Sequence, residues 1–158
     1  MIRSGIGYDV HRFAKGRALI LGGVEITHSC GLEGHSDADV LSHAIADALL
    51  GAIAAGDIGQ HFPNTDESIR NMSSIEILRE VSGLLGKNKA RVINVDATIL
   101  AEAPKIAPHI PAMRKAIAQA IALDESRVGI KATTNEGLGA IGRSEGIAVM
   151  AVASVEME

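Results

Sequence analysis

The sequence of 158 residues predicts an α+β fold, a mixed α/β sandwich in which one sheet is covered by helices. Segments with the alternating pattern of strands are interspersed with segments whose apolar residues recur at helical spacing. The composition is 47% hydrophobic with one Tyr, two Phe and no Trp, so we expect a closely packed aliphatic core. Residues 1–158 are expected to form a single domain: a mainly four-stranded sheet covered by helices on one face, plus a small hairpin.

The strand predictions rest on alternation and on β-branched residues. Residues 2–13 alternate loosely and contain Gly5 and Gly7, and glycine within a strand often marks close approach by another backbone or by a ligand. Two short apolar segments around a Gly-Gly pair predict a hairpin over residues 18–27. Three further strands are expected later in the chain, at 91–101, 128–134 and 147–157.

Helices are predicted from apolar residues at helical spacing, at 38–55, 73–86 and about 110–122. Ser36 or Asp37 is expected to be the N-cap of the first, because a short side-chain oxygen accepts from the free N–H groups there. Asp39, His43 and Asp47 are spaced by four residues and therefore line one side of this helix. Polar side chains on a buried helix do not stabilise it unless groups outside the helix bind them. We therefore expect this helix to lie at the chemical centre of the protein.

Charge and cysteine content restrict the possible partners and compartment. The net charge is -4 with acids and bases interspersed, so no basic patch points to a nucleic acid. The single cysteine, Cys30, excludes an intrachain disulfide framework and fits a reducing compartment. We find neither a signal-peptide pattern nor an apolar run of about 18 residues that could span a membrane. A cytoplasmic protein without nucleic-acid or membrane partners is expected.

Asp9, His11 and His43 form the first group with chemical potential. Asp9 and His11 are two residues apart, so on a strand they point to the same face, and the following helix can add His43. Two imidazoles and one carboxylate suit Zn2+ and leave a fourth position open for substrate or water. Alternatively, Asp-x-His is only a common short pattern and His43 an ordinary helix histidine. Asp47 could orient a ligand or could be a plain hydrogen-bond partner.

Three loops carry further candidate groups. The Gly-rich segment 131–146 offers hydroxyl, carboxylate and Arg side chains beside backbone N–H groups that could approach phosphate, although it lacks the Walker spacing and could be only a turn. The segment 57–66 could bind a polyol through Asp57 or could be a capped rigid turn. The segment 101–105 could present main-chain groups to a base with Lys105 near phosphates, or Lys105 could simply be solvated.

Five motifs occur here in a fixed order: D-x-H, H-S-D-x-D-V-x-x-H, G-D-I-G-x-x-F-P-x-T-D, A-x-A-P-K and K-A-T-T-x-E-x-L-G-x-x-G-R-x-E-G. Together they resemble the 2-C-methyl-D-erythritol 2,4-cyclodiphosphate synthase family of the non-mevalonate isoprenoid pathway. The resemblance covers essentially the whole chain and is far more specific than any one motif. It implies a lyase whose substrate is a CDP-activated methylerythritol 2-phosphate. The 2-phosphate attacks the β-phosphorus and gives the cyclic diphosphate and CMP.

The resemblance also implies roles for individual residues. The family's Zn2+ ligands fall on Asp9, His11 and His43, and its pair that orients the transition state falls on His35 and Thr134. A second metal, Mg2+ or Mn2+, is held by Glu136 with the substrate diphosphate. The other implied substrate contacts are Ser36, Asp57, Ile58, Gly59, Phe62, Pro63, Asn64, Thr65, Asp66, Ala101, Glu102, Ala103, Pro104, Lys105, Ile106, Ala107, Thr133, Ala140 and Arg143.

Within that set, Asp57 is expected to hold the methylerythritol hydroxyls and residues 101–107 the cytidine. The family is a homotrimer with active sites between subunits. Asn64 stands where members often carry an acid, and Ala140 stands where some carry Phe beside a cavity on the trimer axis. Two rival functions remain: a non-catalytic metal-dependent phosphate-binding module, which has no need of the polyol and cytidine loops, and a zinc hydrolase, which needs an H-E-x-x-H-type base that this chain lacks.

Overall fold

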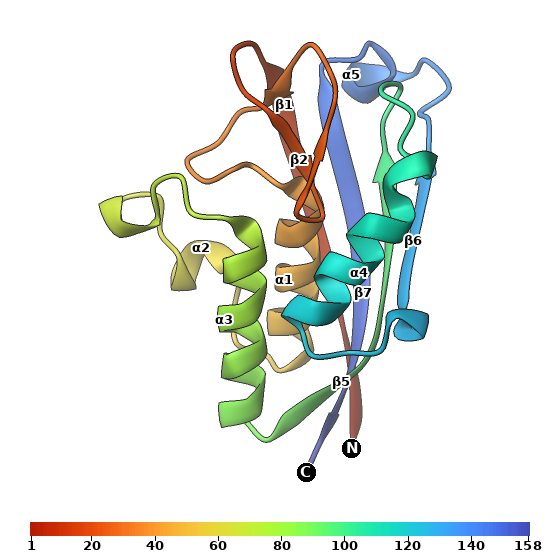
Figure 1. The fold of residues 1–158 in the computed structure, drawn as a ribbon. Coiled ribbons are helices and arrows are strands. Elements are labelled where there is room, and N and C mark those ends of the chain that lie inside the picture. Colours follow the sequence, from red (N-terminus) through yellow and green to blue (C-terminus); the bar gives the residue numbers. More distant parts are fainter.

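A computed structural model describes residues 1–158 and shows a five-stranded mixed sheet, a separate two-stranded hairpin, and helices on one face of the sheet (Figure 1). The strand order is β4-β1-β7-β5-β6, and only the β5–β6 pairing is parallel. The strands of the sheet are β1 (Ile2–Ala14), β4 (Gly31–Leu32), β5 (Ala90–Leu100), β6 (Val128–Thr133) and β7 (Gly146–Met157). The hairpin consists of β2 (Leu19–Leu21) and β3 (Val24–Ile26).

The α-helices are α1 (Val40–Ala52), α2 (Ile58–His61), α3 (Ser74–Lys87), α4 (Ile110–Ala120) and α5 (Gly139–Gly142). Three 3-10 turns lie at Glu67–Ile69, Ala107–His109 and Glu125–Arg127. The three long helices and all the long strands lie where the sequence predicts them, and α2 and α5 are short turns within predicted loops. No helix has both the length and the apolar character needed to cross a bilayer.

The prediction of a mainly four-stranded sheet is one short strand too few. Residues Gly31 and Leu32 pair with Ala14 and Phe13 at the end of β1 and form β4. Two residues are too few to show alternation, so a Gly-containing segment of this length is indistinguishable from a loop in the sequence.

The helix α1 lies at the centre of the core, directly against β1. A Cβ atom added to Gly5 would lie 2.1 Å from the carbonyl oxygen of Ala48, and one on Gly7 would lie 1.9 Å from that of Ala44. The strand therefore packs on the backbone of the helix, which confirms the expected close approach at these glycines. This contact fixes the position of α1 relative to the side chains that follow on β1.

The opposite face of the sheet is uncovered in this chain. Ile6 is 67% exposed, and its neighbours on the same face are also exposed. The register places Ile6 beside Val152 and Tyr8 beside Met150 on β7. Together with Val10, these side chains form an apolar strip, here called the open face, whose members are Ile6, Tyr8, Val10, Met150 and Val152.

The N-cap of α1 is Asp39, so the prediction of Ser36 or Asp37 is wrong. The buried Asp39 carboxylate accepts from the backbone N–H of Ser42 at 3.0 Å. It also accepts from the N–H groups of Gly22 and Gly23, at 2.9 and 2.8 Å, in the turn of the β2–β3 hairpin. One side chain thus starts the helix and holds the hairpin against it.

Candidate active site

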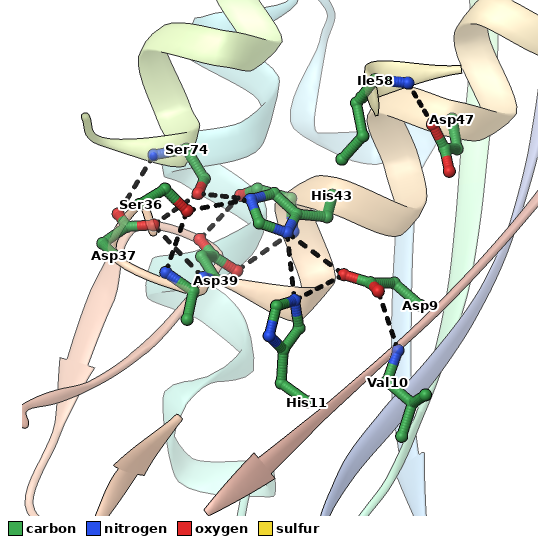
Figure 2. A network of polar contacts seen from close by, with 12 residues as sticks. Asp9, Val10, His11, Ser36, Asp37, Asp39, His43, Asp47, Ile58 and Ser74 are labelled. Carbon is green, nitrogen blue, oxygen red and sulfur yellow. Dashed lines mark hydrogen bonds and ion pairs between the residues drawn. The ribbon is translucent and has the colours of Figure 1, made fainter. Parts of the chain in front are cut away.

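The side chains of Asp9, His11 and His43 converge between β1 and α1 (Figure 2). The Oδ2 atom of Asp9 lies 2.9 Å from Nε2 of His11 and 3.1 Å from Nδ1 of His43, and these two nitrogens are 3.3 Å apart. The other Asp9 oxygen accepts from the N–H of Val10, which leaves Oδ2 to face the histidines. The sequence prediction that these three residues meet is therefore confirmed.

The three facing atoms fit a metal ion. In a tetrahedral site with bonds of about 2.0–2.1 Å, two ligand atoms lie about 3.3 Å apart, close to the separations here. Burial alone raises the pKa of Asp9, but hydrogen bonds and charge from His11 and His43 outweigh it and hold that pKa well below its usual value. Burial lowers the pKa of His11, but contact with Asp9 more than compensates, so its pKa is raised. The carboxylate thus attracts positive charge at the point where a cation would sit.

The second nitrogen of each histidine is held by a neighbouring group. Nδ1 of His11 contacts the carbonyl oxygen of Glu33, so donation there leaves Nε2 free to ligate. Nε2 of His43 lies 2.9 Å from the hydroxyl of Ser74 and 3.3 Å from that of Ser36. Ser74 was not predicted as a site residue, because it lies 31 positions from His43 and the sequence identifies it only as a helix start.

Asp47 does not orient a metal ligand. Its carboxylate accepts from the backbone N–H of Ile58 at 2.8 Å and so anchors the start of α2 to α1 (Figure 2). Burial raises the pKa of Asp47, although the hydrogen bond from Ile58 opposes that shift. The polar row predicted along the first helix therefore divides into a cap at Asp39, a member of the Asp9–His11–His43 cluster at His43 and an anchor at Asp47.

A pocket of about 230 Å³ opens beside the metal cluster. It is lined by the three cluster residues and by several residues predicted to contact substrate: His35, Ser36, Ile58, Gly59, Phe62 and Asn64. The structure thus brings together the metal cluster, the predicted catalytic His35 and the first part of the polyol loop. These groups come from β1, α1, α2 and the segments that flank them.

The backbone around His35 is held on both sides. The guanidinium of Arg17 donates to the carbonyl oxygens of Gly34 and Ser36, the latter at 2.5 Å. The carbonyl of His35 itself accepts from the N–H of Asn71 at 2.9 Å. Arg17 was not predicted from the sequence, because nothing in its local pattern shows that it reaches a loop 17 residues away.

The predicted polyol loop is a series of capped turns. Asp57 caps α2 and accepts from the N–H of Gln60 at 3.0 Å, and Asp66 caps the next 3-10 turn and accepts from Ser68 at 2.9 Å. Both side chains are exposed, as are Pro63 and Thr65. A capped rigid turn and a polyol-binding loop are therefore compatible descriptions, since a fixed backbone presents the same carboxylates to solvent.

A second group of predicted residues gathers at the ends of β5 and β6. The carboxylate of Glu102 accepts from the N–H groups of Asn135 and Gly137, at 2.8 and 3.3 Å. Thr134 contacts Glu136 at 3.4 Å, and Ala101 donates to the carbonyl of Thr133. These contacts join the segments predicted to hold cytidine and phosphate.

The outer members of this second group face solvent. Lys105 and Ala107 are exposed, whereas Ile106 is buried and Ala103 and Pro104 are half-buried. Ala140 lies in α5, and Arg143 pairs with Glu145 at 2.7 Å.

Within one chain the two groups are not brought together. None of residues 101–107 and 133–143 lines the pocket beside the metal cluster. The cluster lies on β1, whereas Thr134 and Glu136 follow β6, the strand at the far edge of the sheet (Figure 1). The expectation that the catalytic residues need not meet within one chain agrees with this separation.

The whole chain matches known proteins of one kind. The model of the YgbB family matches residues 2–156. The 2-C-methyl-D-erythritol 2,4-cyclodiphosphate synthase of Syntrophomonas wolfei is 56% identical over 98% of this chain and 99% of its own length.

Two solved structures are also similar to this chain. The structure of IspF from Plasmodium falciparum in complex with CDP aligns with a TM-score of 0.86 at 34% identity, over 99% of this chain and 97% of that one. The bifunctional IspDF from Campylobacter jejuni aligns with a TM-score of 0.96 at 42% identity, and this chain spans 43% of that longer protein. The chain therefore belongs to the YgbB family, together with these 2-C-methyl-D-erythritol 2,4-cyclodiphosphate synthases.

Proposed function

We propose that this chain converts 4-CDP-2-C-methyl-D-erythritol 2-phosphate into 2-C-methyl-D-erythritol 2,4-cyclodiphosphate and CMP. The observation that carries the proposal is the cluster of Asp9, His11 and His43, which opens into the same pocket as His35 in a chain of this family. The substrate's own 2-phosphate oxygen attacks the β-phosphorus, a new P–O bond forms, and the bond to CMP breaks. No nucleophilic side chain is required.

The donor set of the cluster suits Zn2+, with Asp9, His11 and His43 as ligands and one position left open. Glu136, exposed at the end of β6, would hold Mg2+ or Mn2+ together with the substrate diphosphate. When bound, the two ions would neutralise charge on the phosphates that react.

The residues of the chain itself bind and orient the substrate. An intramolecular phosphoryl transfer depends on holding the nucleophile in line with the leaving group, and such orientation is worth about 7–11 kcal/mol. His35 and Thr134 would fix the phosphates, and the exposed carboxylate of Asp57 would accept from the methylerythritol hydroxyls. Residues 101–107 would bind cytidine, chiefly through main-chain groups, with Lys105 near the phosphates.

A homotrimer would complete this site. The open face gives each chain an unpartnered apolar surface on β1 and β7, and the two groups of site residues lie apart within one chain. We therefore place the active site between subunits, with the metal cluster and polyol loop from one and the cytidine and phosphate segments from the next. Residues 1–158 would act as one catalytic domain in the cytoplasm.

Incubation with the CDP substrate and Mg2+ distinguishes the candidate functions. We expect CMP and the cyclic diphosphate, identified by 31P NMR of the products. CMP with a linear diphosphate would instead indicate a hydrolase, and recovery of unchanged substrate would indicate a binding module. Replacing His43 by Ala should abolish turnover.

A further inference from the structure

We propose that Asp37 and Ser74 act as positioning residues that set the hydrogen-bonding state of His43 and thereby direct its Nδ1 lone pair toward the metal. This inference rests on the proposed function, because it assumes that His43 ligates a metal through Nδ1. Neither Asp37 nor Ser74 contacts the Asp9–His11 side of the cluster (Figure 2).

The contacts form a chain of three side chains. The hydroxyl of Ser74 lies 2.9 Å from Nε2 of His43, on the ring edge opposite the cluster. The same hydroxyl contacts one oxygen of Asp37, and the second oxygen of Asp37 accepts from the backbone N–H of Ser74 at 3.1 Å. Ser74 is fully buried and His43 is 7% exposed, so water does not compete strongly for these groups.

The direction of the hydrogen bonds follows from the donors available. A carboxylate accepts hydrogen bonds and donates none, so the single proton of the Ser74 hydroxyl points to Asp37. Asp37 is also surrounded by donors, since it accepts from the N–H of Asp39 at 3.2 Å. The Ser74 oxygen can then only accept from His43, which requires a hydrogen on Nε2. An imidazole with its hydrogen on Nε2 offers its lone pair at Nδ1, the atom that faces Asp9 and His11.

Asp37 has a second task that couples this arrangement to α3. Ser73, the N-cap residue of α3, makes no side-chain capping hydrogen bond. Asp37, which lies in the segment before α1, caps α3 instead: its carboxylate accepts from the backbone N–H of Ser74, the first residue of the helix. The start of α3 is thereby fixed against His43, because the carboxylate that caps the helix also holds the Ser74 hydroxyl that contacts the ring.

Ser36 offers an alternative partner for Nε2, but it is less well placed. Its hydroxyl lies 3.3 Å from Nε2 of His43 and already accepts from the N–H of Ala38 at 3.1 Å. The shorter contact and the carboxylate behind it make Ser74 the partner that determines the hydrogen position.

Asp37→Asn provides the sharpest test, because it keeps the shape but supplies a donor. The amide can donate to the Ser74 oxygen, the hydroxyl then turns toward Nε2 of His43, and the hydrogen moves off Nε2. Nitrogen NMR on the metal-free full chain should show Nε2 of His43 carrying a hydrogen in the wild type and lacking it in Asp37→Asn. A hydrogen on Nε2 in both proteins would overturn the proposal.

Metal affinity gives the second measurement, by competition between the protein and a chromophoric zinc chelator. We expect Asp37→Asn and Ser74→Ala to weaken Zn2+ binding about 10- to 100-fold. Ser73→Ala, the same change one residue away without a capping contact, should bind as the wild type does. Ser74→Ala keeps the test available if Asp37→Asn fails to fold.

The outcomes separate the two proposals. If the Zn2+ affinity of the wild type does not exceed that of His43→Ala, the proposed metal site itself is overturned. Wild-type Zn2+ binding that is matched in both Ser74→Ala and Asp37→Asn would overturn only the role assigned to Asp37 and Ser74.

Discussion

The guanidinium of Arg17 fixes the loop that presents His35, although it makes no hydrogen bond to the His35 ring. It donates to the carbonyls on both sides of that residue, and the planar group can satisfy both acceptors at once. Arg17→Ala should release the loop and lower kcat about 10- to 100-fold, because small misplacements of an orienting group are costly. Zn2+ content should stay unchanged, since Asp9, His11 and His43 keep their positions.

Steady-state kinetics and metal analysis check this expectation. Lys15→Ala removes an exposed cation two residues away that makes no side-chain hydrogen bond, and it should retain wild-type kcat. Unchanged kcat in Arg17→Ala would show that the His35 loop is held by Asn71 alone. Loss of Zn2+ would show that the effect extends to the cluster.

At this scale the sequence predicts which residues cluster better than it predicts the residues that hold the cluster in place. Asp9, His11 and His43 were predicted because their residue types and spacing resemble those of a metal site. Arg17 and Ser74 were not predicted, because Arg and Ser are common and their partners lie 17 and 31 residues away. The role of such residues depends on which backbone segments the fold brings together, and no local pattern records that.

Among the elements, β1 and α1 together carry the metal cluster and are joined by backbone contact at Gly5 and Gly7. Gly7→Ala would place a methyl group 1.9 Å from the Ala44 carbonyl, and neither backbone can yield without moving the cluster. We expect a loss of about 3 kcal/mol or more in the free energy of unfolding, together with weaker Zn2+ binding.

Urea unfolding measures this loss, and Gly83→Ala is the matched control. Gly83 lies in α3 with no atom within 4 Å of an added Cβ. The free energy of unfolding of Gly83→Ala should rise by up to about 1 kcal/mol, because alanine favours the helix. Equal stability of the two variants would contradict the close packing of β1 on α1.

Asp39 links two elements, α1 and the hairpin, through both carboxylate oxygens. In Asp39→Asn the amide nitrogen replaces either Oδ1, which accepts from the N–H groups of Gly22 and Ser42, or Oδ2, which accepts from the N–H of Gly23 and the hydroxyl of Ser42. In either orientation a buried donor loses its acceptor. This should cost about 1–3 kcal/mol at neutral pH, measured by urea unfolding.

The pH dependence of that difference has a definite sign. Burial raises the pKa of Asp39 above its ordinary value of 3.8, so the folded state binds its proton more readily than the unfolded state does. This carboxyl therefore adds stability as pH falls from the raised folded pKa to below 3.8, and the wild type should gain stability relative to Asp39→Asn across that range. If the difference in the free energy of unfolding between the wild type and Asp39→Asn becomes smaller as pH falls through this range, the raised pKa of Asp39 is contradicted.

Element types were predictable because long periodic segments dominate this chain, whereas caps and short strands were not. Asp39 was expected to line up with His43 on one helix side, yet it lies just outside α1 and caps it. Several short polar residues precede this helix, and the choice among them depends on the hairpin turn, which supplies two further donors to Asp39 alone.

For the whole molecule, the open face and the separation of the two groups of site residues both support the proposed homotrimer. The apolar strip of β1 and β7 has no partner within the chain, and a face of this kind marks a contact surface. Glu136 and Thr134 lie away from the pocket that contains His35, so a neighbouring chain must supply them if the proposed site is correct. The sequence could indicate this assembly only through family resemblance, because one chain's periodicity does not show which face meets a second copy.

Ile6→Glu tests the assembly and its function together. Ile6 belongs to the open face and is 67% exposed, and a charge there would be buried against another chain in a trimer. We expect the variant to sediment as a monomer. It should bind Zn2+ as the wild type does, because Asp9, His11 and His43 belong to one chain. It should lose turnover, because the proposed complete site needs residues from two chains. Lys115→Glu, an exposed change on α4 on the helix-covered side, should remain trimeric and active. A monomeric Ile6→Glu protein with full turnover would show that one chain completes the site, and an unchanged trimer would show that the contact lies on another surface.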